Sequence, residues 1–192
     1  RRIDPYIDDH RVDDAIIFPA TGHLEIATAA ARHAFGGDFN FLEDVNFESA
    51  LFLPDDGAMY DVKVEVSSEE EKYWILSRDT SNPDAEWIKH SNGKMNVLGD
   101  QFTSHAVNLT EIQERVNDRL PVQPMYLELK KSGLQYGPIF KAIKNLWVVD
   151  QEILGKIELH ESLEYEVEKY NLHPSVLGAC LHTIFAAKKS TD

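Results

Sequence analysis

Histidine is the residue type of this chain best suited to acid–base chemistry. The 192 residues include eight histidines: His10, His23, His33, His90, His105, His160, His173 and His182. An imidazole titrates near neutral pH, so it can remove a proton from carbon or donate one to a leaving group. His10 lies among carboxylates in the segment DDHRVDD, just before an apolar run. On spacing alone it is either an exposed loop residue or a general base.

The other histidines have no catalytic partner at a recognisable spacing. Four are expected at the surface: His33, His90, His105 and His160. His23 falls in the first turn of a helix, where packing or capping is expected. His173 is interpreted as a turn residue ahead of a second helix, and His182 as a residue on the surface of that helix.

Common motifs for metal, nucleotide and hydrolase chemistry are absent from the sequence. It holds no HExxH pair, and its single cysteine, Cys180, cannot build a Cys-rich zinc site, so no metal is expected. It also lacks the GxGxxG, GxxxxGKS or GxxxxGKT, and GxSxG patterns. Cys180 lies among apolar residues at helical spacing, which favours a buried small hydrophobic residue over a nucleophile.

The composition excludes several classes of partner. The net charge is −14, whereas a nucleic-acid-binding surface needs an excess of cations. No apolar run approaches the ~20 residues that span a bilayer, and no signal peptide is visible. One cysteine excludes an internal disulfide and fits a reducing compartment, so a cytoplasmic location is expected.

Periodicity predicts two α+β units, each with a long helix on an antiparallel sheet. Long helices are predicted at 18–35 and 173–189, and shorter ones at 109–119 and 125–133. Strands are predicted at 45–53, 60–66, 72–78, 86–98 with an interruption at 91–93, 140–150 and 153–160. The expected organisation is a first unit at 1–100, a linker at 101–123 and a second unit at 124–192.

Gly178 is the unusual residue of the second long helix. Glycine inside a helix costs about 1 kcal/mol relative to alanine, so a reason other than helix stability is expected. Close packing is one explanation. Loss of a functional side chain is the other.

Five segments, in order along the chain, resemble the dehydratase domains of polyketide synthases and animal-type fatty acid synthases. The first, HRVDDAIIFP from His10 to Pro19, is similar to the motif HxxxGxxxxP, with Asp14 in place of its glycine. The others are 18–29, 42–54, LQYGPIF at 134–140, which resembles YGPxF, and HPSVLGACLH at 173–182, which resembles HPxLLDxxxQ/H.

The resemblance implies a double hot-dog fold and a tunnel with a histidine from the first unit and an aspartate from the second. The implied substrate is a 3-hydroxyacyl thioester on the phosphopantetheine arm of an acyl carrier protein, which loses water to give an enoyl thioester. It implies no cofactor in the domain itself. The implied partners are the carrier and other domains of the same synthase, and a homodimer is common in the family.

The same resemblance assigns roles to individual positions. His10 would be the general base, Gly178 stands at the position of the family's aspartate, and His182 matches the residue that supports it. The implied substrate-binding residues are Pro19, Tyr136, Gly137, Pro138, Phe140 and His173.

Gly178 leaves three hypotheses open. The domain is a dehydratase type whose acid has been lost, or an enoyl isomerase that uses His10 alone, or a catalytically silent module of a synthase. Matched to the family, the chain is also expected to be incomplete at both ends. Its negative charge predicts that a carrier docks at a local basic patch, either Lys130 and Lys131 or Lys141 and Lys144.

Overall fold

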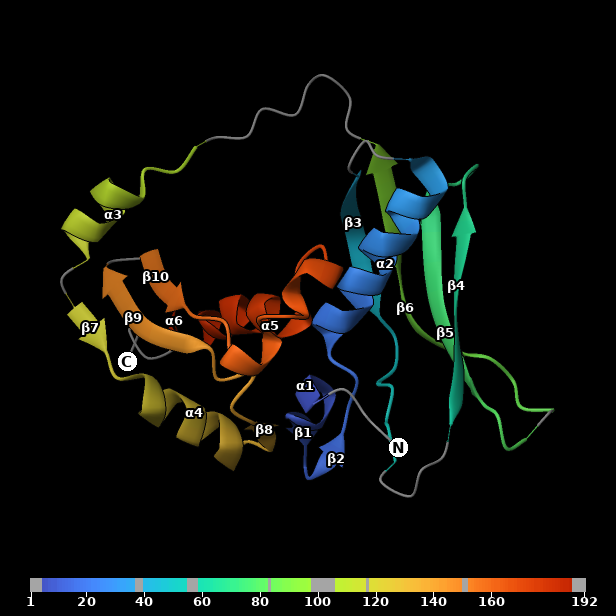
Figure 1. Cartoon of the computed structure of the whole chain (residues 1–192), viewed down its shortest axis with the longest axis horizontal. Helices are drawn as coiled ribbons and strands as arrows, with labels where there is room; N and C mark the ends of the chain where they lie inside the picture. Colours follow the sequence, from blue (N-terminus) through green and yellow to red (C-terminus); the bar gives the residue numbers. More distant parts are fainter. Residues whose placement is uncertain are drawn as a thin grey trace. The chain divides into compact units, whose positions relative to one another are not determined.

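The computed structural model describes residues 5–36, 40–54, 59–82, 84–97, 106–116, 118–149 and 152–187. The chain divides into two compact units (Figure 1). The first is Ala15–Thr103, and the second combines Arg2–Asp14 with Ser104–Asp192. The segment that carries His10 therefore groups with the second unit rather than with residues 1–100, because its strand pairs with a strand of that unit.

The first unit is one helix on a four-stranded antiparallel sheet. The sheet has the order β3-β6-β5-β4, and the short strand β2 (Ala15–Ile16) precedes the helix α2 (Ala20–Phe35). The sheet strands are β3 (Asn40–Phe47), β4 (Tyr60–Ser67), β5 (Lys72–Asp79) and β6 (Ile88–Val97). Figure 1 shows α2 lying along one face of this sheet.

Small residues let α2 approach the sheet closely. Ala27 and Ala31 are one turn apart and fully buried against Tyr73, Ile75 and Met95. The helix begins after Pro19 and ends at Gly36, whose positive φ of 83° suits glycine. The predicted helix at 18–35 is confirmed in position.

Strand β6 is continuous, so the predicted interruption at 91–93 is wrong. These three residues pair with Ile75, Trp74 and Tyr73 of β5, and β3 pairs with β6 on the other side. Pairing on both edges outweighs the turn preference of Ser-Asn-Gly. The irregularity lies one residue earlier: Ile75 pairs with Ser91 and Leu76 with Lys89, which leaves His90 as a bulge.

The second unit holds the remaining elements. Strand β1 (His10–Val12) pairs antiparallel with β8 (Leu134–Tyr136), and a second sheet has the order β10-β9-β7. Its strands are β7 (Asp118–Leu120), β9 (Ile143–Val149) and β10 (Glu152–Ile157). Its helices are α1 (Pro5–Asp8), α3 (Leu109–Arg115), α4 (Val122–Lys131), α5 (Pro174–His182) and α6 (Ile184–Ala187), with 3-10 turns at Glu161–Leu163 and Val167–Lys169.

Three expectations for this unit need correction. The predicted linker at 101–123 contains the expected short helix, and it also contains strand β7, which pairs with β9, so the chain rejoins a sheet before residue 124. The predicted helix at 173–189 is divided at Thr183, whose hydroxyl bonds to the carbonyl of Cys180 at 2.7 Å. Cys180 itself is exposed, because α5 turns this side away from the unit's core. His105 and residues 188–189 lie outside the described residues.

Candidate active site

His10 lies on a strand and packs against two aromatic rings. Antiparallel pairing of β1 with β8 places His10 opposite Tyr136. The centroid of the His10 ring lies 5.5 Å from that of Tyr136 and 5.1 Å from that of Phe140. The imidazole is half-buried, so it is held in place while part of it stays accessible. A loop residue in solvent is not what the structure shows.

Helix α5 carries three of the other predicted positions and brings one of them, His182, to the same aromatic ring. Its N-cap is His173, which is fully buried and whose Nδ1 accepts a hydrogen bond from the backbone N–H of Ser175. Gly178 is buried in mid-helix, and His182 follows one turn later. The His182 ring is 4.1 Å from that of Tyr136, between centroids. Tyr136 is therefore a shared neighbour of His10 and His182.

His182 is a buried neutral group rather than the surface residue expected from spacing. Only 5% of it is exposed, and burial followed by the electrostatic effect of His10 lowers its pKa to about 4. Its Nδ1 has no hydrogen-bond partner among the described residues. Helix α5 has no carboxylate in its sequence PSVLGACLH.

The loop after β8 is tied to the residue that precedes His10. The carbonyl of Asp9 accepts from the N–H of Gly137 at 2.8 Å, and its carboxylate Oδ2 accepts from the N–H of Ile139 at 2.7 Å. A Cβ at Gly137 would collide with this carboxylate, so glycine is required there. These bonds set Phe140, which is 1% exposed, beside His10. Sequence reasoning missed Asp9, although its place next to His10 was a signal.

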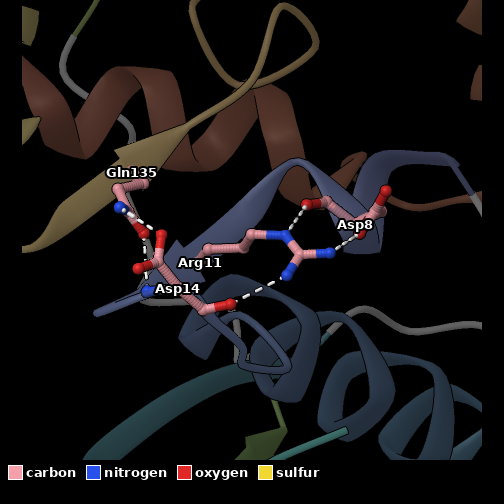
Figure 2. Close-up of polar contacts among 4 residues, drawn as sticks. All are labelled: Asp8, Arg11, Asp14 and Gln135. Atoms are coloured by element: carbon pink, nitrogen blue, oxygen red, sulfur yellow. Dashed lines mark hydrogen bonds and ion pairs between the residues drawn. The ribbon is translucent and has the colours of Figure 1, made fainter. Parts of the chain in front are cut away.

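The turn after β1 explains the departure from glycine at Asp14. Asp13 and Asp14 have positive φ angles of 48° and 66°, a region that favours glycine and tolerates aspartate. Two hydrogen bonds to Gln135 offset the strain of this backbone conformation at Asp14. Gln135 Oε1 accepts from the Asp14 N–H at 2.7 Å, and Gln135 Nε2 donates to Asp14 Oδ1 at 2.8 Å. Figure 2 shows this clamp, together with Arg11 bonded to Asp8 and to the carbonyl of Asp14.

The remaining implied binding residues fall in both units. Tyr136, Gly137, Pro138, Phe140 and His173 belong to the second unit. Pro19 belongs to the first unit, where it is the N-cap of α2 and is fully buried. Burial raises the pKa of Tyr136, so its phenol stays protonated at neutral pH.

Two histidines form a buried cluster in the first unit. His90 is 2% exposed, and its Nε2 lies 2.7 Å from Ser77 Oγ, so its expected surface position is wrong: the bulge turns it inward. His23 packs as expected, with its ring centroid 6.0 Å from that of His90. Burial and the charge of His90 lower the pKa of His23 to about 4.

Two family models match the chain. Residues 1–78 match the model described as polyketide synthase dehydratase domain, and residues 104–191 match the one described as polyketide synthase dehydratase N-terminal domain. This chain belongs to the polyketide synthase dehydratase domains. Members of this family are hydro-lyases, so the implied family is confirmed, and the implied enzyme class is confirmed at the level of the family.

Curated relatives and solved structures agree with this assignment. The chain is 27% identical to polyketide synthase GfsE of Streptomyces halstedii, over 94% of this chain and 5% of that protein. It is 30% identical to a highly reducing polyketide synthase of Pyrenophora dematioidea, over 95% of this chain and 8% of that protein. The chain thus corresponds to a small part of each multidomain relative.

Solved dehydratase domains have the same fold. The CurJ dehydratase of the curacin polyketide synthase is 26% identical, with a TM-score of 0.84 over 95% of this chain and 62% of that one. An inactive Asp-to-Asn mutant of the CurK dehydratase is 30% identical, with a TM-score of 0.82 over 95% of this chain and 63% of that one. A His-to-Phe mutant of the same domain is also described as inactive. The predicted double hot-dog fold is confirmed.

Within the described ranges, no group of histidine, cysteine or acidic side chains is arranged to hold a metal ion. Among the same residues, no helix combines the length and apolarity needed to cross a membrane.

Proposed function

We propose that this domain binds a 3-hydroxyacyl thioester on the phosphopantetheine arm of an acyl carrier protein, with His10 as its general base, and eliminates water slowly because Gly178 replaces the acid. The observation that carries the proposal is that His10 and His182 of α5 both pack against Tyr136. That helix carries His182 and no carboxylate. The site thus retains a base and lacks an acid on the helix where the family has one.

The two halves of the reaction place different demands on these residues. His10 can remove the α-proton, which the thioester carbonyl makes acidic. The β-hydroxyl must then receive a proton to leave as water, and His182, with a pKa of about 4, is neutral at pH 7. A positioned general acid typically contributes about 10²- to 10⁴-fold. Elimination is therefore slowed by a factor in this range.

The solved relatives support this division of roles. In the CurK dehydratase, an Asp-to-Asn mutant and a His-to-Phe mutant are each described as inactive. His10 corresponds by motif to the family's histidine, and Gly178 to its aspartate. Glycine removes more of the acid than asparagine does, since no side-chain proton donor remains.

Replacing Gly178 by aspartate tests the proposal. Gly178→Asp restores a carboxylic acid one turn before His182 and is expected to accelerate water loss about 10²- to 10⁴-fold on a carrier-bound 3-hydroxyacyl substrate. Product formation is followed by mass spectrometry. Gly178→Ala is the matched control, because it adds a Cβ and helix propensity without an acid, and it should not accelerate the reaction.

Fast turnover by the unchanged chain, abolished by His10→Ala, would contradict the proposal and show that another residue supplies the proton. If His10→Ala leaves the slow rate of the unchanged chain and the rate of Gly178→Asp unaltered, the role of His10 is also wrong. A catalytically silent module remains the explanation if neither chain reacts, and it fails if His10→Ala changes the product of an intact, assembled synthase.

The paired histidines favour a second candidate, an enoyl isomerase. Moving a double bond from α,β to β,γ needs a base that takes a proton from one carbon and returns it to another, and it needs no leaving hydroxyl. His10 satisfies this requirement without Gly178. An enoyl thioester incubated with the protein in deuterated water should gain label at the α or γ carbon, and absence of label removes this candidate.

A further inference from the structure

A basic cavity lies in the second unit of an otherwise acidic chain. Its volume is about 580 Å³, and its cationic lining residues are Arg119, Lys141 and Lys144. The other lining residues are apolar or carry an amide, and none is acidic. The whole chain has a net charge of −14, so a cavity lined by three cations and no acid differs in sign from the chain as a whole.

We infer that Arg119, Lys141 and Lys144 bind the phosphate group of the carrier's phosphopantetheine arm. This inference rests on the proposed function, which makes such an arm the substrate's attachment. A phosphodiester is an anion with oxygen acceptors, which guanidinium and ammonium groups bind by charge-assisted hydrogen bonds. The apolar part of the same lining suits the carbon chain that adjoins the phosphate.

Two of the three cations in this cavity have no acidic partner among the described residues, and the third, Lys144, has only a long contact with one. No carboxylate of the described residues forms an ion pair with Lys141 or Arg119. In the amide orientation that satisfies both groups, the Asn145 oxygen accepts from Arg119 Nε at 3.1 Å, which is a neutral partner. Lys144 lies 3.7 Å from Glu158, which is nearer to Lys156, at 3.0 Å.

The cavity is also connected to the candidate active site through one loop. A smaller neighbouring cavity of about 300 Å³ shares Lys141 and Lys144, is bounded by Pro138, and also has Glu158 and Glu161 in its lining, so the phosphate is placed in the larger cavity, which has no acid. The N–H of Lys141 bonds to the carbonyl of Gly137 at 3.1 Å. Pro138 and Lys141 therefore flank Phe140, the ring that packs against His10. The loop thus carries Lys141, one of the proposed phosphate-binding residues, and Phe140, which packs against His10.

The other basic pair that the sequence analysis named is a poorer candidate. Lys130 and Lys131 end α4, and Lys131 is already paired with Glu128, Nζ to Oε1, at 2.7 Å. Neither lysine lines the two cavities. The structure thus favours Lys141 and Lys144 over Lys130 and Lys131, whereas the sequence alone gave no reason to prefer one pair.

Two ligands that differ only by the phosphate provide the test. Pantetheine 4′-phosphate and pantetheine are titrated into the whole chain at low salt, and binding is followed by NMR. The phosphorylated ligand should bind at least ~10-fold more tightly, since charge-assisted hydrogen bonds are among the stronger ones. Lys141→Gln with Lys144→Gln should bring the two affinities within ~2-fold of each other. The matched control, Lys130→Gln with Lys131→Gln, should preserve the difference.

Three results would overturn the inference. The first is equal affinity of the unchanged chain for the two ligands. The second is an equal loss of the preference for the phosphorylated ligand in the two double variants. The third is an affinity for inorganic phosphate as high as that for pantetheine 4′-phosphate. The last would make the cavity a general anion site. NMR spectra of the free double variants verify that both remain folded.

Failure of the proposed function gives a different pattern. In that case Gly178→Asp does not gain activity on a pantetheine thioester that lacks phosphate, while the phosphate preference persists. If only the proposed phosphate site is wrong, the chain does not prefer the phosphorylated ligand, and Gly178→Asp still gains activity on that thioester.

Discussion

At the residue scale, Asp14 shows how a side chain is accommodated where the family motif has glycine. Its φ of 66° strains most residues, and its two hydrogen bonds to Gln135 offset this. The same bonds join the turn after β1 to β8, and β1 and β8 carry His10 and Tyr136. The clamp thus contributes to the register that places His10.

Removing the clamp should destabilise the second unit unless the strain is removed as well. Asp14→Ala keeps the left-handed backbone and loses the side-chain bond, so we expect a loss of about 1–2 kcal/mol in the free energy of unfolding. Asp14→Gly loses the same bond but relieves the strain, so its loss should be smaller. Urea denaturation of both variants measures this. If the glycine variant were the less stable of the two, the explanation would be wrong.

At the element scale, strand β6 positions a titratable cluster that periodicity does not predict. The alternation of apolar and polar residues along 86–98 does not predict a bulge, because a bulge depends on the register of the neighbouring strand. The bulge turns His90 into the core beside His23. By contrast, α2 was predictable because its small residues and its stop at Gly36 are local signals.

The buried histidines should make the fold sensitive to acid. His23 and His182 have folded-state pKa values of about 4, against an ordinary value of 6.5, so the unfolded chain binds protons first. Stability is full above about pH 6.5 and falls towards pH 4, by up to about 1.4 kcal/mol per pH unit for each group. His23→Asn should flatten this dependence. His33→Gln, at an exposed position, should not.

Urea midpoints at a series of pH values from 7 to 4.5 provide the measurement for these variants. A midpoint that stays constant or rises on acidification would contradict the assignment of both histidines as neutral in the folded chain.

At the scale of the whole molecule, the sequence motifs determined the family, and contacts distant in sequence determined the site. Five ordered segments were enough to indicate the dehydratase domains. They did not indicate that the segment with His10 groups with the second unit, because this follows from its pairing with β8, more than a hundred residues away. The burial of His182 and the role of Asp9 were likewise hidden, since both depend on Tyr136 and the loop beside it.

In the proposed mechanism, His10 takes the α-proton, and the absence of an acid at Gly178 limits the loss of water. One reaction tests both parts: a carrier-bound 3-hydroxyacyl thioester in deuterated water, with α-deuterium and enoyl product quantified together. We expect deuterium to enter the unreacted substrate faster than enoyl product forms, His10→Ala to abolish the exchange, and Gly178→Asp to shift the ratio towards product. Enoyl formation by the unchanged chain without prior exchange, at the rate of Gly178→Asp, would contradict this mechanism.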